Sequence, residues 1–168
     1  PPNANNAALA RGAAKLGIPS AAIRRNVRGC WNLGYCGMGC PTNAKQSMLV
    51  TTLPTALSRG AKLVTRVRAE RLVVAGDKVD RLEARALDAT GTTPTDRRVT
   101  VRARSYVAAG GAIGTPALLL RSGTPDPHGL VGKRTFLHPT IVSAAIMPER
   151  VDGFAGAPQT VYSDHWLD

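Results

Sequence analysis

The sequence predicts a mixed α/β (α+β) fold, and three observations support that prediction. An alanine-rich segment near the start repeats its apolar residues with helical spacing. A central stretch alternates apolar and polar residues, and residues 105–123 join a short apolar run to a helical pattern through paired glycines. The chain has 168 residues and is 43% hydrophobic but only 4% aromatic. Its length suits one domain, or parts of two, with a core built mainly from Ala, Val and Leu.

Two helices are expected in the first sixty residues. Asn6–Leu16 is rich in alanine, and Gly17 is a natural end because glycine adopts the left-handed conformation that closes a helix. Lys45–Ser58 carries an apolar stripe, but Pro54 interrupts it. Either this helix is kinked at Pro54, or a new helix begins there with Thr52 as its cap.

An antiparallel meander is expected in the middle of the chain. Its strands show alternation or short apolar runs, and they are Lys62–Val67, Arg71–Ala75, Val79–Leu87 and Arg97–Ala103. The residues Gly76, Asp77 and Lys78 form a hairpin-like turn between two of them. The meander should lead into a buried strand at Tyr106–Ala109.

The segment from Ser105 to Gly123 is a strand, a glycine turn and a helix. Gly110 and Gly111 allow the backbone to turn sharply and to approach a ligand closely. Thr115 is the expected N-cap of the helix, with Pro116 at its first position. Because a helix N-terminus favours phosphate groups, this corner is a candidate nucleotide contact. A turn made for packing alone would use the same residues.

The remaining segments are expected to be mostly loop. They lack periodicity and are rich in Gly, Pro, Asn and Arg, and they are Ile18–Cys40, Ser122–Pro139 and Gly153–Pro158. Thr140–Met147 alternates weakly and is predicted to be a further strand.

Cys30, Cys36 and Cys40 follow a C-x5-C-x3-C spacing in a glycine-rich loop. Zinc and iron–sulfur sites mostly use four ligands with C-x2-C pairs, so no metal site is predicted. If the protein is exported, a disulfide between two of the thiols is the alternative interpretation. The preferred interpretation is that small buried thiols pack the loop.

Composition and motifs exclude several classes of function. The formal net charge is +11, yet the arginines are scattered and no aromatic residues lie between them, so nucleic-acid binding is not expected. No run of 18 apolar residues predicts a membrane span, and no signal peptide is visible. Lys45 and Ser47 do not form a Walker motif, and no G-x-S-x-G hydrolase motif is present.

Three blocks carry a resemblance to a known family. They are C-W-N-L-G-Y-C-G-M-G-C-P-T-N-A-K-Q-S at residues 30–47, S-Y-V-A-A-G-G-A-I-G-T-P-A-L-L-L-R-S-G at residues 105–123, and V-G-K-R-T-F-L-H-P at residues 131–139. In order and spacing they resemble the middle of the glucose–methanol–choline (GMC) oxidoreductases, most closely the alcohol-oxidising branch, from about Leu16 onward. Thr124, Pro125 and Arg134 depart from the family pattern.

The resemblance implies FAD as cofactor and an alcohol (CH–OH donor) as small-molecule substrate. It implies that residues 1–45 border the two domains, that residues 46–139 are part of an FAD-binding Rossmann-like domain with a β-meander, and that residues 140–168 begin the substrate-binding domain. The family's G-x-G-x-x-G motif and catalytic histidine have no counterpart here. We therefore expect an internal fragment with no catalytic residue, inactive by itself. His138 matches a structural position of the family.

The resemblance also implies which residues contact the cofactor. A backbone group near Ala69 would bind adenine, with Arg68 and Glu70 as rivals for that position. The turn formed by Ala109, Gly110, Gly111 and Ala112, with Thr115 at the helix cap, would lie beside the ADP half of FAD. The alternative to an alcohol oxidoreductase is a basic, non-enzymatic binding module or an inactive remnant of a flavoenzyme.

Overall fold

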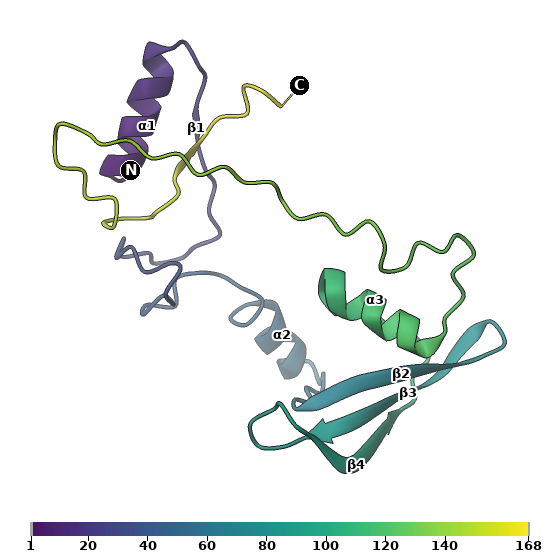
Figure 1. Ribbon diagram of the computed structural model, residues 1–168. Coiled ribbons are helices and arrows are strands. Elements are labelled where there is room, and N and C mark those ends of the chain that lie inside the picture. Colours follow the sequence, from purple (N-terminus) through teal and green to yellow (C-terminus); the bar gives the residue numbers. More distant parts are fainter. Residues whose placement is uncertain (1, 168) are drawn as a thin grey trace. The chain divides into compact units, whose positions relative to one another are not determined.

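A computed structural model of the chain describes residues 2–167. Its elements are α1 (Ala4–Lys15), β1 (Ala21–Ala22), α2 (Thr52–Ser58), β2 (Val67–Ala75), β3 (Lys78–Leu87), β4 (Pro94–Val101), α3 (Gly111–Ser122) and β5 (Val161–Tyr162). Helices and antiparallel sheets occur together, which confirms the mixed α/β class (Figure 1). No helix among residues 2–167 has the length and hydrophobicity that a membrane span needs.

The chain forms two compact units. One unit combines residues 1–62 with residues 142–168, and the other contains residues 63–141. These limits differ from the predicted boundaries at residues 45 and 139. The assignment of those segments to cofactor and substrate domains stays a prediction.

The predicted meander is the centre of the second unit, where β2, β3 and β4 are neighbours in that order. Ala75 pairs with Lys78, so the turn between β2 and β3 has two residues. Gly76 begins this turn with a positive φ of 64°. A two-residue hairpin turn that has glycine at its first position needs a positive φ there. Leu72 and Ala84 are the buried apolar residues of the sheet.

Helix α3 packs against β2, the edge strand (Figure 1). The Ser122 hydroxyl accepts a hydrogen bond from the Leu72 amide at 2.9 Å and donates one to the Leu118 carbonyl at 2.6 Å. The Arg121 guanidinium donates to the Glu70 carbonyl at 3.3 Å. The C-terminal turn of α3 therefore satisfies backbone groups on the outer edge of β2, which the sheet leaves unpaired.

In the first unit, α1 begins and ends close to where the sequence predicts. The Asn3 side chain caps the helix by accepting a hydrogen bond from the Asn6 amide at 2.9 Å. Gly17, just after the helix, has a φ of 69°. Asn6 also reaches the C-terminal segment, because its side-chain oxygen accepts hydrogen bonds from the amides of Thr160 at 2.9 Å and Val161 at 3.2 Å.

The second predicted helix is much shorter than expected. Residues 45–47 are not helical, because Lys45 bridges to Val27 and the Gln46 amide donates to the Asn26 carbonyl at 2.9 Å, and residues 48–51 form turns. The helix α2 begins only at Thr52, with Thr51 in the cap position. Of the two alternatives for Pro54, the new helix is the one observed, and its start falls one residue from the prediction.

Three predicted strands are absent from the described chain. The strand Lys62–Val67 is replaced by irregular backbone up to Arg66, whose φ of 54° ends any extended run, so β2 begins at Val67. Residues 106–109 have no neighbouring strand, and the Tyr106 hydroxyl instead donates to the Asp80 carbonyl at 3.0 Å. Residues 140–147 are exposed and have no partner strand in the described chain.

Candidate functional site

The glycine turn before α3 is built by a contact between backbone and one side chain. The Gly110 amide donates a hydrogen bond to the Thr115 hydroxyl at 2.8 Å, and that hydroxyl lies 3.4 Å from the Ala108 carbonyl. A methyl group at Gly110 would lie 3.0 Å from the Thr115 nitrogen. Gly111 has a φ of 75°, which side-chain-bearing residues rarely adopt. Both glycines are therefore required by the shape of the turn.

The helix begins five residues before the predicted position, so Thr115 is not its N-cap. Gly110 is the N-cap, and Gly111 and Ala112 are the first residues of α3. Pro116 lies inside the helix, where its missing N–H deprives the Ala112 carbonyl of a partner. The Thr115 hydroxyl holds the start of the helix by bonding back to Gly110.

The N-terminal amides of α3 are available to an anion. The N-cap, Gly110, makes no side-chain cap, and the first turn contains no acidic residue. Residues 109–114 are exposed. Since the first amides of a helix lack partners within the helix and carry partial positive charge, this turn can accept a phosphate.

Ala69 lies elsewhere on the second unit. It is on β2 opposite Ala84, and its carbonyl accepts a long hydrogen bond of 3.5 Å from Arg121 at the C-terminal end of α3. The glycine turn is at the other end of that helix. The structure thus brings Ala109, Gly110, Gly111, Ala112 and Thr115 together, and places Ala69 apart from them.

The rivals of Ala69 are both engaged within the sheet region. Arg68 donates to the Thr92 carbonyl at 2.9 Å. Glu70 lies 2.9 Å from Arg85 in an ion pair. Glu70 also sits at a bulge, since the register of β2 against β3 shifts between Ala69 and Arg71.

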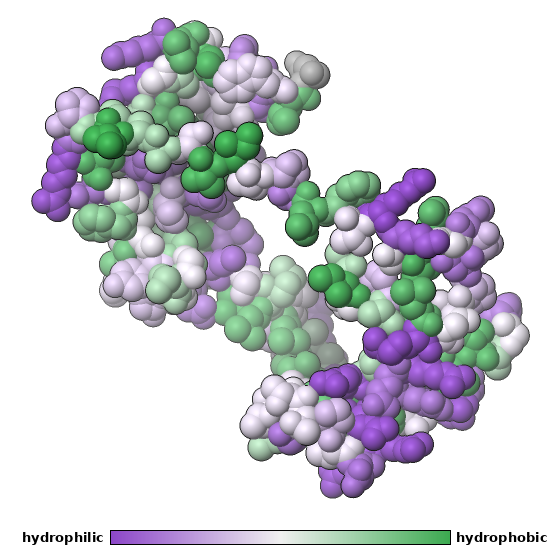
Figure 2. All heavy atoms as spheres, viewed as in Figure 1, coloured by the Kyte–Doolittle hydropathy of each residue, from purple (hydrophilic) through white to green (hydrophobic). Residues whose placement is uncertain are grey.

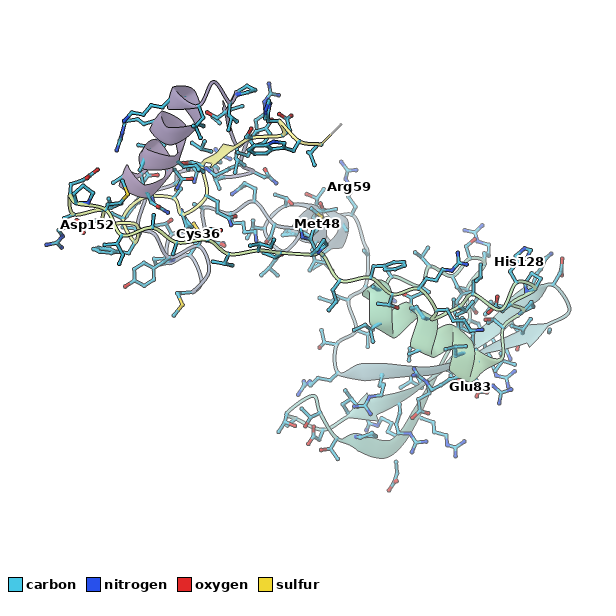
Figure 3. All side chains as sticks on the ribbon, turned by 45° about the horizontal axis from the view of Figure 1, so that its top comes forward. Cys36, Met48, Arg59, Glu83, His128 and Asp152 are labelled. Atoms are coloured by element: carbon cyan, nitrogen blue, oxygen red, sulfur yellow. The ribbon has the colours of Figure 1, made fainter. Side chains whose placement is uncertain are left out.

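The cysteine loop borders a cavity of about 510 Å³ in the first unit. Cys30, Cys36 and Cys40 all line it, together with Arg25 and Lys45. The expectation of buried thiols is wrong, because Cys30 and Cys40 are half-buried and Cys36 is exposed. Figure 3 labels Cys36 in the first unit. The loop cannot bury them because its backbone folds around the cavity instead of filling it.

One cysteine of this loop has an altered acidity. The Thr42 hydroxyl, 3.3 Å from Cys40 Sγ, lowers the pKa of that thiol, and the Ala44 amide, which donates to the same sulfur at 3.4 Å, lowers it further. Hydrogen bonds to the thiolate favour the charged form. Within residues 2–167, no three or more His, Cys, Asp or Glu side chains gather as a metal site would require.

Comparisons with known proteins agree on one family. The sequence profile described as GMC oxidoreductase matches residues 1–140. An uncharacterised GMC-type oxidoreductase of Mycobacterium tuberculosis is 35% identical over 93% of the chain and 24% of its own length. A long-chain-alcohol oxidase of Arabidopsis thaliana is 29% identical over 90% of the chain and 21% of its length.

A third relative has a different substrate in its name. The 2-methyl-1,2-propanediol dehydrogenase of Mycolicibacterium austroafricanum is 35% identical over 71% of the chain and 22% of its own length. The chain thus spans about a quarter of the length of the curated relatives it matches. No solved structure matches.

Proposed function

This chain belongs to the GMC oxidoreductase family, and from that premise we propose that it is part of an FAD-dependent oxidoreductase that oxidises an alcohol. The observation that carries the proposal is the family match over residues 1–140. Family membership makes the protein an oxidoreductase, and relatives named as a long-chain-alcohol oxidase and a 2-methyl-1,2-propanediol dehydrogenase support a CH–OH donor.

The residues at the start of α3 fit the anionic half of FAD. Gly110 has no room for a side chain, because a methyl group there would lie 3.0 Å from the Thr115 nitrogen, and the exposed amides that follow it lack side-chain caps. A diphosphate could approach this backbone closely and accept hydrogen bonds from it. The turn carries no carboxylate that would repel such a ligand.

The residues proposed to hold the cofactor are Ala109, Gly110, Gly111, Ala112 and Thr115. The backbone of the first four would contact the ADP half, and Thr115 would keep the turn in shape through its hydrogen bond to the Gly110 amide. Ala69 is proposed to bind adenine through its backbone from the edge of β2.

These residues would hold FAD, which would supply the hydride acceptor for oxidation of the alcohol carbon. The described residues contribute binding and orientation at its nucleotide half. No base that would remove the hydroxyl proton is assigned to this chain.

The test compares Gly110, in the glycine turn, with Gly114, inside α3, in the protein expressed at its full natural length. Gly110→Ala places a methyl group 3.0 Å from the Thr115 nitrogen, so we expect loss of most bound flavin. Gly114→Ala is the matched control, because nothing lies within 4 Å of its added methyl group and its φ is not positive. Flavin per protein follows from the visible absorbance.

Activity is measured on the same preparations with a long-chain primary alcohol and a 1,2-diol. Alcohol-dependent bleaching of the flavin in the unsubstituted protein is the expected result. A folded protein that binds no flavin, or one whose flavin content falls equally in both glycine variants, contradicts the proposal.

A further inference from the structure

The three cysteines of the chain share one environment in the first unit. Backbone pairing brings the two ends of their loop together, since Val27 bridges to Lys45 and the Arg28 amide donates to the Ala44 carbonyl at 2.8 Å. As a result, Cys30, Cys36 and Cys40 line the same 510 Å³ cavity, and all three also line a smaller one. Three thiols from a loop of eleven residues thus face shared space.

The surroundings of Cys40 favour a thiolate. Its sulfur has two close polar neighbours, the Thr42 hydroxyl at 3.3 Å and the Ala44 amide at 3.4 Å. Arg25 and Lys45 line the cavity, and none of the described residues lining it is acidic. A thiolate that is hydrogen-bonded and partly open to solvent is the reactive form of cysteine.

We propose that Cys40 is a peroxide-reactive thiol that forms a disulfide with Cys30 or Cys36. The site takes hydroperoxides as its substrate class. Cys40 makes the first attack because its sulfur alone of the three accepts a backbone hydrogen bond in the described structure. Cys30 and Cys36 supply the second thiol, since both line the cavities that Cys40 lines.

The chemistry balances with hydrogen peroxide as the oxidant. The Cys40 thiolate attacks one peroxide oxygen, an S–O bond forms, the O–O bond breaks, and the leaving hydroxide takes a proton to become water. Cys40 is oxidised to a sulfenic acid. The second thiol then attacks the Cys40 sulfur, forming the S–S bond, breaking the S–O bond and releasing a second water. Two thiols and one peroxide give one disulfide and two waters.

The first experiment treats the protein of full natural length with one equivalent of hydrogen peroxide. Remaining thiols are then alkylated, and peptides are mapped by mass spectrometry without reduction. We expect loss of two thiols and a cross-linked peptide that contains Cys40. A Cys30–Cys36 cross-link with Cys40 free, or retention of all three thiols, overturns the proposal.

The second experiment asks whether the environment of Cys40 sets its reactivity. Iodoacetamide should label Cys40 severalfold faster than Cys36 at neutral pH, although Cys36 is more exposed. Thr42→Val should slow Cys40 labelling severalfold at neutral pH and leave it unchanged at a pH where all thiols are ionised. A slowing at every pH would indicate a merely structural effect, and equal labelling of Cys36 and Cys40 would contradict the proposal.

Thr52→Val is the matched control for this variant. The Thr52 hydroxyl also contacts a sulfur, Met48 Sδ at 3.2 Å, but lies outside the cysteine loop. Labelling of Cys40 should be unchanged in it. All these readouts count thiols and need no bound flavin, so their failure would leave the alcohol-oxidation proposal untouched.

Discussion

Asn3 and Asn6 are polar side chains that lie buried in the first unit. Asn3 caps α1 and donates to the carbonyls of Gly153 at 3.1 Å and Ala155 at 2.9 Å. The Asn6 amide group donates to the Pro158 carbonyl at 2.9 Å. Two asparagines one helical turn apart thus join the first helix to a segment about 150 residues later. Such a long-range use of asparagine leaves no local pattern in the sequence.

Replacing Asn6 by alanine should destabilise the first unit. The amides of Thr160 and Val161 and the Pro158 carbonyl would lose their partner, and each buried polar group left unpaired costs about 1–3 kcal/mol. We expect a fall of about 2–4 kcal/mol in the free energy of unfolding, measured with urea. Asn5→Ala, at an exposed position of the same helix, should change it little. An equal fall in both variants would show that the buried hydrogen bonds of Asn6 add nothing to the free energy of unfolding.

The carboxylate of Asp126 gives the second unit a pH dependence. The Val131 amide at 2.9 Å and the Leu130 amide at 3.0 Å donate to it and lower its pKa below the ordinary 3.8. A lowered folded-state pKa adds stability above the unfolded-state value, and that stability is lost as the pH falls through the folded-state value. The gap in unfolding free energy between the protein and Asp126→Ala should stay constant above about pH 5 and shrink below about pH 4.

Denaturant melts from about pH 2 to pH 7 would measure this gap. Asp77→Ala in the hairpin turn is the control, because its carboxylate makes no hydrogen bond within the described structure. A gap that persists at the lowest pH would show that Asp126 acts through packing and not through its charge.

At the scale of elements, the candidate cofactor site depends on the packing of α3 against β2. Ser122 and Arg121 fix the C-terminal turn of α3 to the edge of β2. The glycine turn at the other end of the helix is held by Thr115. The helix therefore links the Ala69 position with the proposed phosphate-binding turn.

Ser122→Ala should weaken the packing of α3 against β2. The Leu72 amide would lose its partner next to a buried side chain, at a cost of about 1–3 kcal/mol. Urea unfolding measures the loss, and faster hydrogen exchange of the Leu72 amide would locate it. Ser58→Ala is the matched control, because Ser58 also bonds back to its own helix, at the Thr55 carbonyl, but accepts from no strand. Unchanged exchange at Leu72 would contradict the role given to Ser122.

Sequence patterns predicted the elements whose cause is local. The end of α1 at Gly17, the Gly76 hairpin and the alternating strand β3 follow from residue types within each segment. The paired glycines before α3 were found for the same reason. The predicted start of α3 was wrong because Thr115-Pro116 matches a capping signal. In the structure the Thr115 hydroxyl instead accepts a hydrogen bond from the Gly110 amide in the turn before it.

Two of the three predicted strands that failed are ones that need a partner from elsewhere. Residues 106–109 and 140–147 have apolar patterns suited to a sheet, but no strand lies beside them in the described chain. A strand without a neighbour leaves its amides and carbonyls unpaired. Local pattern alone therefore cannot decide whether such a segment becomes a strand.

At the scale of the whole chain, large apolar side chains remain in solvent in both units. Ile141 is 93% exposed and Ile146 is 102% exposed, and among residues 2–167 only four apolar residues are buried. Figure 2 shows hydrophobic residues on the visible surface of each unit. Surfaces of this kind mark interfaces. The formal charge of +11 opposes self-association at low salt, and added salt weakens this repulsion by screening it.

The 168-residue chain produced by itself should therefore bind a hydrophobic dye and associate as salt is raised. Each buried CH₂ contributes about 0.8 kcal/mol, so uncovered Phe136, Leu137, Ile141 and Ile146 favour any contact that hides them. ANS fluorescence and light scattering between low and moderate ionic strength measure this.

Ile141→Ser combined with Ile146→Ser should lower both signals in the isolated chain. In the protein of full natural length the same pair should instead lower stability, because there those side chains would be covered. Weak dye binding by a monomeric isolated chain at all salt concentrations would mean that these segments fold back on the chain itself.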